Sequence, residues 1–193
     1  MNGNNILVLA IISSFSVLTY FWFFQVSWKK ALYGILIGGP ASFLASLVLE
    51  EISLTYLSMM IVVIIFAPII EESMKFMATR YGRNTDAGIG VGMGFALLEN
   101  ALYYSSFFYM FNLIFVLREF SDPILHGTTT SVATFTWKKK YLSIGAAIGM
   151  HMGWNVFAVL TSGDPFLVII PSVVFFAVLY AVRNKEKLKI LKN

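Results

Sequence analysis

Residues 54–79 read LTYLSMMIVVIIFAPIIEESMKFMAT, and this stretch predicts both the fold and the site. Its first part, up to residue 70, carries no charge, and Glu71, Glu72 and Lys75 then follow within the same run. Because a helix needs about 20 apolar residues to cross a bilayer, the stretch predicts a transmembrane helix with charged groups inside it. Elsewhere too the chain is apolar: 58% of its 193 residues are hydrophobic and only 12% are charged. We therefore expect an integral membrane protein.

Seven runs of the sequence are long and apolar enough to span a membrane. They predict an all-α polytopic membrane protein that forms a single transmembrane helical domain over residues 1–193. The expected spans are about 6–26, 31–49, 54–79, 86–110, 112–137, 141–162 and 165–183. The first run has no basic residues before it, so we interpret it as a retained helix and not as a signal peptide.

The charges between these runs alternate along the chain. Basic residues and acidic residues fall in successive loops in this order: Lys29 and Lys30, then Glu50 and Glu51, then Arg80 and Arg83, then Lys138 to Lys140 after an uncharged loop, then Asp164, then Arg183 and the lysines of the tail. Basic loops stay in the cytoplasm, so this order predicts an N-terminus outside and a cytoplasmic C-terminus. The expected location is the cell membrane, with several passes.

Several classes of protein are excluded or disfavoured. The chain has no cysteine, which excludes disulfides, thiolate catalysis and cysteine-ligated metals. The net charge of +4 comes from loops and the tail, so nucleic acid is not an expected partner. Glycines recur at GxxxG spacing in two spans, where they predict close helix packing and not dinucleotide binding. These glycines are Gly88, Gly90, Gly92 and Gly94 in one span, and Gly145, Gly149 and Gly153 in the other.

Ionisable residues fall inside four of the predicted spans. They are Glu71, Glu72, Lys75, Glu99, Arg118, His126 and His151. Each costs about 2.5–3.5 kcal/mol near the centre of a bilayer, so they are expected to face the interior of the bundle. At about 1.5 Å per residue, the carboxylates and imidazoles lie roughly 12–20 Å from the cytoplasmic helix ends, in one slab. Three aspartates, Asp86, Asp122 and Asp164, are expected near helix ends or in loops, which argues against an aspartyl dyad.

Local spacing adds detail to this slab. Glu71 and Glu72 precede Lys75 by four and three residues, so either carboxylate can pair with the lysine. His151 and Asn155 are four residues apart and share one helix face. Pro68, one turn before Glu71, is expected to kink its helix and to free a backbone carbonyl near the site.

These groups predict hydrolysis without a covalent nucleophile. A buried carboxylate can act as a general base toward water, and histidine and asparagine donors can stabilise an oxyanion. Neither a GxSxG elbow nor an HExxH motif is present. Two alternatives stay open: a zinc peptidase that uses Glu72, Glu99, His126 and His151 as ligands, and a proton- or ion-coupled transporter with a Glu/His relay. A non-catalytic scaffold is disfavoured because so many ionisable groups converge.

Four motifs between residues 68 and 155 resemble those of PrsW-type intramembrane proteases. The run from Pro68 to Lys75 resembles EExxK, the run from Phe95 to Asn100 resembles FAxxEN, and Arg118 with His126 and His151 with Asn155 resemble the third and fourth motifs. The wider group of CAAX prenyl endopeptidases and bacteriocin-processing proteins has EExxxR instead, and a histidine where Glu99 stands. The sequence is therefore closer to the PrsW branch.

The resemblance implies roles for these residues. Glu71 would be the general base with Glu72 assisting, His126 would help to hold the water, and His151 with Asn155 would form the oxyanion site. Glu99 would belong to the same site, and Lys75, Asn100 and Arg118 would support it. The implied partners are a membrane-anchored protein substrate and the lipid bilayer, and no cofactor is expected.

Overall fold

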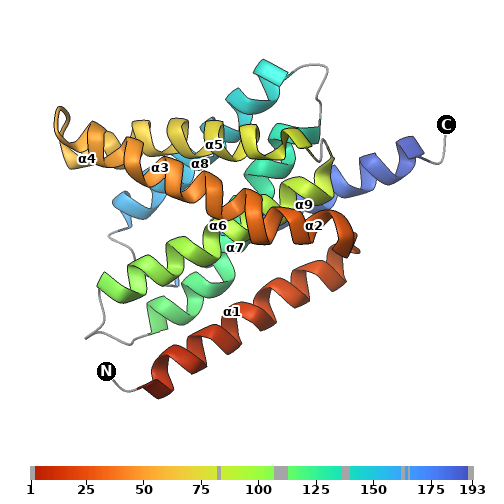
Figure 1. Cartoon of the computed structure of the whole chain (residues 1–193), viewed down its shortest axis with the longest axis horizontal. Helices are drawn as coiled ribbons and strands as arrows, with labels where there is room; N and C mark the ends of the chain where they lie inside the picture. Colours follow the sequence, from red (N-terminus) through yellow and green to blue (C-terminus); the bar gives the residue numbers. More distant parts are fainter. Residues whose placement is uncertain are drawn as a thin grey trace.

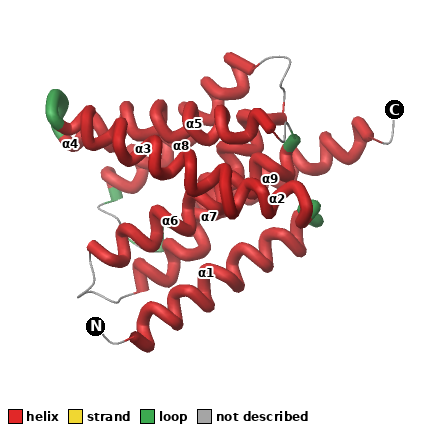
Figure 2. Tube along the Cα trace, in the orientation of Figure 1, coloured by secondary structure: helices red, strands yellow, loops and turns green. Residues whose placement is uncertain are grey.

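A computed structural model describes residues 3–81, 84–106, 113–135, 140–161, 164 and 166–190 of the chain. Within these ranges the protein is 92% helix and contains no strand, which confirms the all-α prediction (Figure 2). The helices are α1 (Gly3–Phe24), α2 (Trp28–Tyr33), α3 (Gly39–Leu54), α4 (Met59–Ile61), α5 (Ala67–Ala78), α6 (Thr85–Ser106), α7 (Leu113–Phe135), α8 (Lys140–Leu160) and α9 (Ile169–Ile190).

Short stretches of other helix types join some of these elements. The π-helical turn η1 (Gly34–Gly38) links α2 to α3, so that residues 28–54 form one continuous rod. A second π-helical turn, η2 (Val62–Phe66), links α4 to α5, and the 3₁₀ turn η3 (Thr79–Tyr81) ends that rod. Helices α3 and α5 of the two rods lie side by side in the upper half of Figure 1. π-helical turns occur often near functional sites, and η2 stands one turn before Glu71.

The helix bounds differ from the predicted spans at several ends. Lys29 and Lys30 were expected in a loop but lie within α2, and Lys140, also expected in a loop, begins α8. Glu50 and Glu51 were expected in a loop but lie within α3, which continues to Leu54. Arg183 was expected in the tail but lies within α9, which continues to Ile190. Lysine, arginine and glutamate are good helix formers, so a helix does not have to end where its apolar run ends. The predicted junction between the fourth and fifth spans, and Arg83, Lys138 and Lys139, lie outside the described residues.

Two of the described helices are long and apolar enough to cross a membrane, Trp28–Leu54 and Tyr141–Leu160. The rod that contains α5 and the helices α7 and α9 each carry several charged residues, which lower their hydropathy. In the rod that contains α5 and in α7, charged residues of the candidate site therefore also weaken the hydropathy signal.

Helix α6 runs through the centre of the bundle because glycine lets its backbone approach two neighbours. A Cβ atom on Gly90 would collide with Ala31 of α2, and one on Gly94 would lie 2.7 Å from the Ile35 carbonyl of η1. A Cβ on Gly92 would collide with the backbone carbonyl of His126 in α7. Real Cβ atoms do not approach so closely, so the predicted packing role of the α6 glycines is confirmed. The contact at Gly92 holds α7 against α6 at the backbone of His126.

The same prediction was wrong for the glycines of α8. A Cβ on Gly145, Gly149 or Gly153 would meet no atom within 4 Å. The spacing is the same as in α6, but no described helix packs on this face. A GxxxG pattern permits a close contact and does not supply the partner.

Three distant helix ends are tied together by Arg183 of α9. Its guanidinium donates to the backbone carbonyls of Phe24 and Gln25 at the end of α1, and its Nη1 lies 2.8 Å from Asp86 Oδ1 at the start of α6. Gln25 has a positive φ of 51°, a conformation in which helices commonly end. The arginine satisfies carbonyls left free by the end of α1, so these three ends stay at one side of the bundle.

Beside its apolar core, the bundle has large apolar side chains on the surface and charged side chains in the interior. Large apolar side chains lie on its surface: Trp22 is 81% exposed and Leu36 is 69% exposed. Glu72, Lys75 and His126 lie in its interior with at most 1% of their surface exposed. Buried charges require partners, and the structure supplies them at one place between α5, α6, α7 and α8.

Candidate active site

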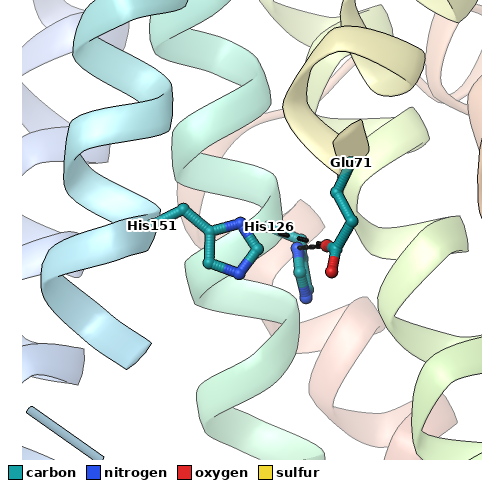
Figure 3. A group of neighbouring side chains, drawn as sticks. All are labelled: Glu71, His126 and His151. Atoms are coloured by element: carbon teal, nitrogen blue, oxygen red, sulfur yellow. Dashed lines mark ion pairs between the residues drawn. The ribbon is translucent and has the colours of Figure 1, made fainter. Parts of the chain in front are cut away.

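Three predicted site residues reach toward one another from three helices (Figure 3). Glu71 comes from α5, His126 from α7 and His151 from α8. Glu71 Oε2 lies 3.8 Å from His126 Nδ1 and 3.9 Å from His151 Nδ1. Although these residues are up to 80 positions apart in the sequence, their polar atoms share one small volume.

Pro68 leaves one backbone carbonyl of η2 without its helical donor. In η2 each N–H bonds five residues back, and the N–H of Ala67 reaches the carbonyl of Val62. The next bond would run from residue 68 to Val63, but proline has no N–H. The free carbonyl of Val63 accepts instead from Asn155 Nδ2 of α8 at 2.8 Å. The predicted free carbonyl is therefore present, and it is used to hold α8 against η2.

Lys75 lies at the centre of the cluster, fully buried. Its Nζ is 2.7 Å from Glu72 Oε1, 3.3 Å from Glu71 Oε2 and 2.6 Å from His126 Nδ1. The ammonium also lies 4.4 Å from the centre of the Phe95 ring, within the range of a cation–π contact. Both carboxylates predicted to compete for this lysine thus pair with it, which lowers the cost of burying all three charges.

Glu72 is held in place by several donors. Its Oε1 accepts from Thr129 Oγ1 at 3.0 Å and lies 2.9 Å from His151 Nδ1, in addition to the Lys75 contact. Since a carboxylate only accepts, the hydrogen of His151 is placed on Nδ1, and the Nε2 atom has no hydrogen-bond partner among the described residues. Glu72 therefore orients the imidazole of His151.

The partners of His126 fix its tautomer. Lysine can only donate, so Nδ1 of His126 accepts from Lys75, and Nε2 carries the hydrogen. That hydrogen points to Glu99 Oε2, 2.8 Å away. Neutral His126 thus connects the Lys75 cluster to Glu99 of α6.

Arg118 forms a second charged centre beside the first. Its Nη2 lies 2.8 Å from Glu99 Oε1 and 3.1 Å from Asp122 Oδ2, and its Nε donates to Asn100 Oδ1 at 2.8 Å. The guanidinium also stacks on Tyr103, with Cζ 3.9 Å from the ring centre. Asn100 and Arg118 therefore hold Glu99 in place.

The expected position of Asp122 was wrong. It lies in the middle of α7, 3% exposed, and 4.0 Å from His126 Nε2. Asp122 lies nine residues inside α7 and one helical turn before His126, not at a helix end. Glu119 was not predicted as a site residue either. It is buried on the same helix and accepts hydrogen bonds from Asn100 and from Ser13 of α1. Sequence offered a signal for Asp122, because it lies four residues from both Arg118 and His126.

A cavity of about 620 Å³ opens over this cluster. Among its lining residues are six of the predicted ones: Glu71, Glu99, Arg118, His126, His151 and Asn155. Glu72 and Lys75 lie behind this surface with none of their side chains exposed. The two adjacent glutamates are therefore not equivalent, because Glu71 faces the cavity and Glu72 supports the residues that do.

The acids and histidines that could bind a metal are grouped differently from the prediction. Glu72, Glu99, His126 and His151 do not meet at one point. Glu99 contacts Nε2 of His126 directly, whereas Glu72 lies on the Nδ1 side of the ring, where the Lys75 ammonium contacts both the carboxylate and Nδ1. In the described part of the chain, two overlapping groups have ligand atoms within 4.8 Å of one another: Glu71, His126 and His151, and Glu99, Asp122 and His126. The donor types suit zinc, and both groups share His126.

Comparison with known proteins gives no match to a protein-family model, to a curated protein or to a solved structure.

Proposed function

We propose that this chain is an intramembrane peptidase that cuts membrane-anchored proteins with a water activated by Glu71. The observation that carries the proposal is the position of Glu71 on the cavity surface, beside two histidines and above a buried lysine. The motifs that resemble those of PrsW-type proteases include all of these residues. A buried carboxylate, imidazoles and an amide around one cavity are the groups that hydrolysis of a peptide bond needs.

The proposal includes seven spans, an outside N-terminus and a cytoplasmic C-terminus. The exposed apolar side chains and the buried charges support a position of the whole bundle within the lipid bilayer. The Arg183 contacts support the order of the spans, because the proposed topology assigns the end of α1, the start of α6 and the end of the last span to the same side.

Each group has a role in the proposed reaction. Glu71 takes a proton from a water as the water attacks the scissile carbonyl. His151, oriented by Glu72, receives this proton from Glu71 on Nε2, donates it as a hydrogen bond to the developing oxyanion and then transfers it to the leaving amine, which leaves both side chains as they began. Asn155 uses one amide hydrogen on Val63 and offers the other to the oxyanion. His126 and Lys75 keep Glu71 in position.

A zinc peptidase is the second candidate, favoured by the group of Glu71, His126 and His151. The Lys75 ammonium argues against it, because Nζ lies 2.6 Å from His126 Nδ1 and 3.3 Å from Glu71 Oε2, two of the three ligand atoms. A divalent ion would have to displace that charge. If zinc binds, Glu71, His126 and His151 would hold it and it would polarise the water.

The test uses purified chain in liposomes with single-span membrane proteins as substrates. Wild-type protein should cut at least one substrate, and Glu71→Gln should reduce the rate by about 10²–10⁴-fold. Glu119→Gln is the matched control, because it neutralises a buried carboxylate that does not line the cavity, and it should keep most of the activity. Activity that survives in Glu71→Gln contradicts the proposal, and proton flux without any cleavage would favour a transporter.

A further inference from the structure

The lining of the 620 Å³ cavity carries more acidic than basic side chains. Five carboxylates contribute to it: Glu50, Glu51, Glu71, Glu99 and Asp122. Among the described residues that line the cavity, Arg118 is the only lysine or arginine, and it is already paired with Glu99 and Asp122. A concave surface with this balance attracts cations, and apolar surroundings strengthen the attraction.

The charge at one end of the cavity has no internal partner. Glu50 is half-buried and Glu51 is exposed at the end of α3. Neither makes an ion pair with a residue that the structure describes. The floor of the cavity, by contrast, is formed by Glu71, which is 7% exposed and paired with Lys75. The lining therefore has one end at the cluster, where the carboxylates are paired, and an acidic end at α3, where Glu50 and Glu51 are not paired with any described residue.

A buried hydroxyl lies next to the acidic end. Ser46 is one turn before Glu50 on α3, lines the same cavity and is 1% exposed. Its Oγ has no hydrogen-bond partner. Ser42 and Ser53 of the same helix bond to the carbonyls of Gly39 and Leu49, as helical serines commonly do. The Oγ atom of Ser46 is therefore buried without a hydrogen-bond partner among the described residues, which costs free energy of folding.

We propose, building on the proposed function, that this end of the cavity binds a lysine or arginine side chain of the substrate. Glu50 and Glu51 pair with its charge, and Ser46 Oγ accepts one of its N–H groups. In the proposed topology α3 ends on the outer side of the membrane. The selected substrates therefore carry a basic residue on the outer side of the scissile bond, where membrane spans seldom have one.

The test measures binding of three single-span peptides that differ at one position on the outer flank of the cleaved region, which holds Lys, Gln or Glu. Binding is measured in liposomes with the full wild-type chain and with Glu71→Gln. The Lys peptide should bind about tenfold more tightly than the Gln peptide. The double variant Glu50→Gln/Glu51→Gln should remove this difference, and Glu50→Lys/Glu51→Lys should reverse the order in favour of the Glu peptide.

Asp164→Lys is the matched control, because it changes charge in a loop assigned to the same side but outside the cavity, and it should leave the order intact. Equal binding of the three peptides, or an order that the double variants do not change, overturns the inference. Cleavage without a charge preference also overturns it. Charge-selective binding without cleavage would support this subsite and contradict the proposed peptidase activity, so the two failures are distinguishable.

Discussion

Nδ1 of His151 lies 2.9 Å from Oε1 of Glu72, a contact that joins residues 79 positions apart. Glu71, the neighbour of Glu72 in sequence, faces the cavity instead. Adjacent residues on a helix point about 100° apart, so one carboxylate can orient the imidazole while the other meets the water. The two glutamates of the motif therefore have different tasks in the proposed mechanism, and substitutions should separate them.

Replacing Glu72 with Gln should lower both activity and stability. The neutral amide no longer stabilises protonated His151, so kcat should fall by about 10²–10⁴-fold with little change in KM. The variant should also lose about 3 kcal/mol of stability, because Lys75 loses its nearest counter-charge. Unfolding in mixed micelles, compared with Glu71→Gln, measures the second effect. A stability loss larger in Glu71→Gln than in Glu72→Gln would contradict the assignment of Glu72 as the buried anchor.

Replacing Lys75 with Ala should create a metal site. Removal of the ammonium leaves Glu71, His126 and His151 with ligand atoms within 4.8 Å and no cation between them. Co²⁺ added to the variant should give the visible absorption of a tetrahedral site at about one ion per chain, and wild type should give none. The double variant Lys75→Ala/His126→Ala should lose the signal. Stoichiometric Zn²⁺ in freshly purified wild-type protein would contradict this account.

Asn155 and Pro68 should be energetically coupled through Val63. Asn155→Ala leaves the Val63 carbonyl without its donor and should cost about 1–3 kcal/mol. In a Pro68→Ala background residue 68 regains an N–H that can serve the carbonyl, so the same change should cost less by about 0.5 kcal/mol or more. A double-mutant cycle in mixed micelles measures the difference. Strictly additive effects would mean that the free carbonyl is not the reason for the Asn155 contact.

Two glycine substitutions should have opposite outcomes. Gly92→Ala drives a methyl group into the backbone of α7 at His126 and should cost about 1–3 kcal/mol and disturb the site. Gly149→Ala meets open space and should be neutral or slightly stabilising, since alanine favours helix more than glycine. Thermal inactivation of both variants provides the comparison. Equal loss in both would show that α8 has a partner on its glycine face.

Much of the fold followed from the sequence because hydropathy and helix period are local properties. The helical ranges and the convergence of Glu71, Glu99, His126 and His151 follow from counting residues along each helix. The exact contacts do not, because they depend on how the helices are rotated about their axes. Hydropathy and spacing alone could not show that Lys75 reaches His126, that Thr129 holds Glu72, or that Glu72 is hidden behind Glu71.

Two errors show where local patterns mislead. Asp122 was expected near a helix end or in a loop, although it lies ten residues inside the expected span 112–137 and well inside α7. The α8 glycines were assigned to packing because the GxxxG spacing is the same with or without a neighbour. For the glycines the missing information was the position of a second helix.

Chemical rescue tests the central claim most directly, namely that the carboxylate of Glu71 acts on water in the cavity. Glu71→Ala and Glu72→Ala are prepared in liposomes with the same substrate, and formate is added to each. Formate can enter the space beside His126 and His151 when Glu71 is truncated, so we predict that it restores cleavage to Glu71→Ala in a saturable manner and leaves Glu72→Ala inactive. Full activity of Glu71→Ala without formate, or rescue of Glu72→Ala alone, would contradict the account.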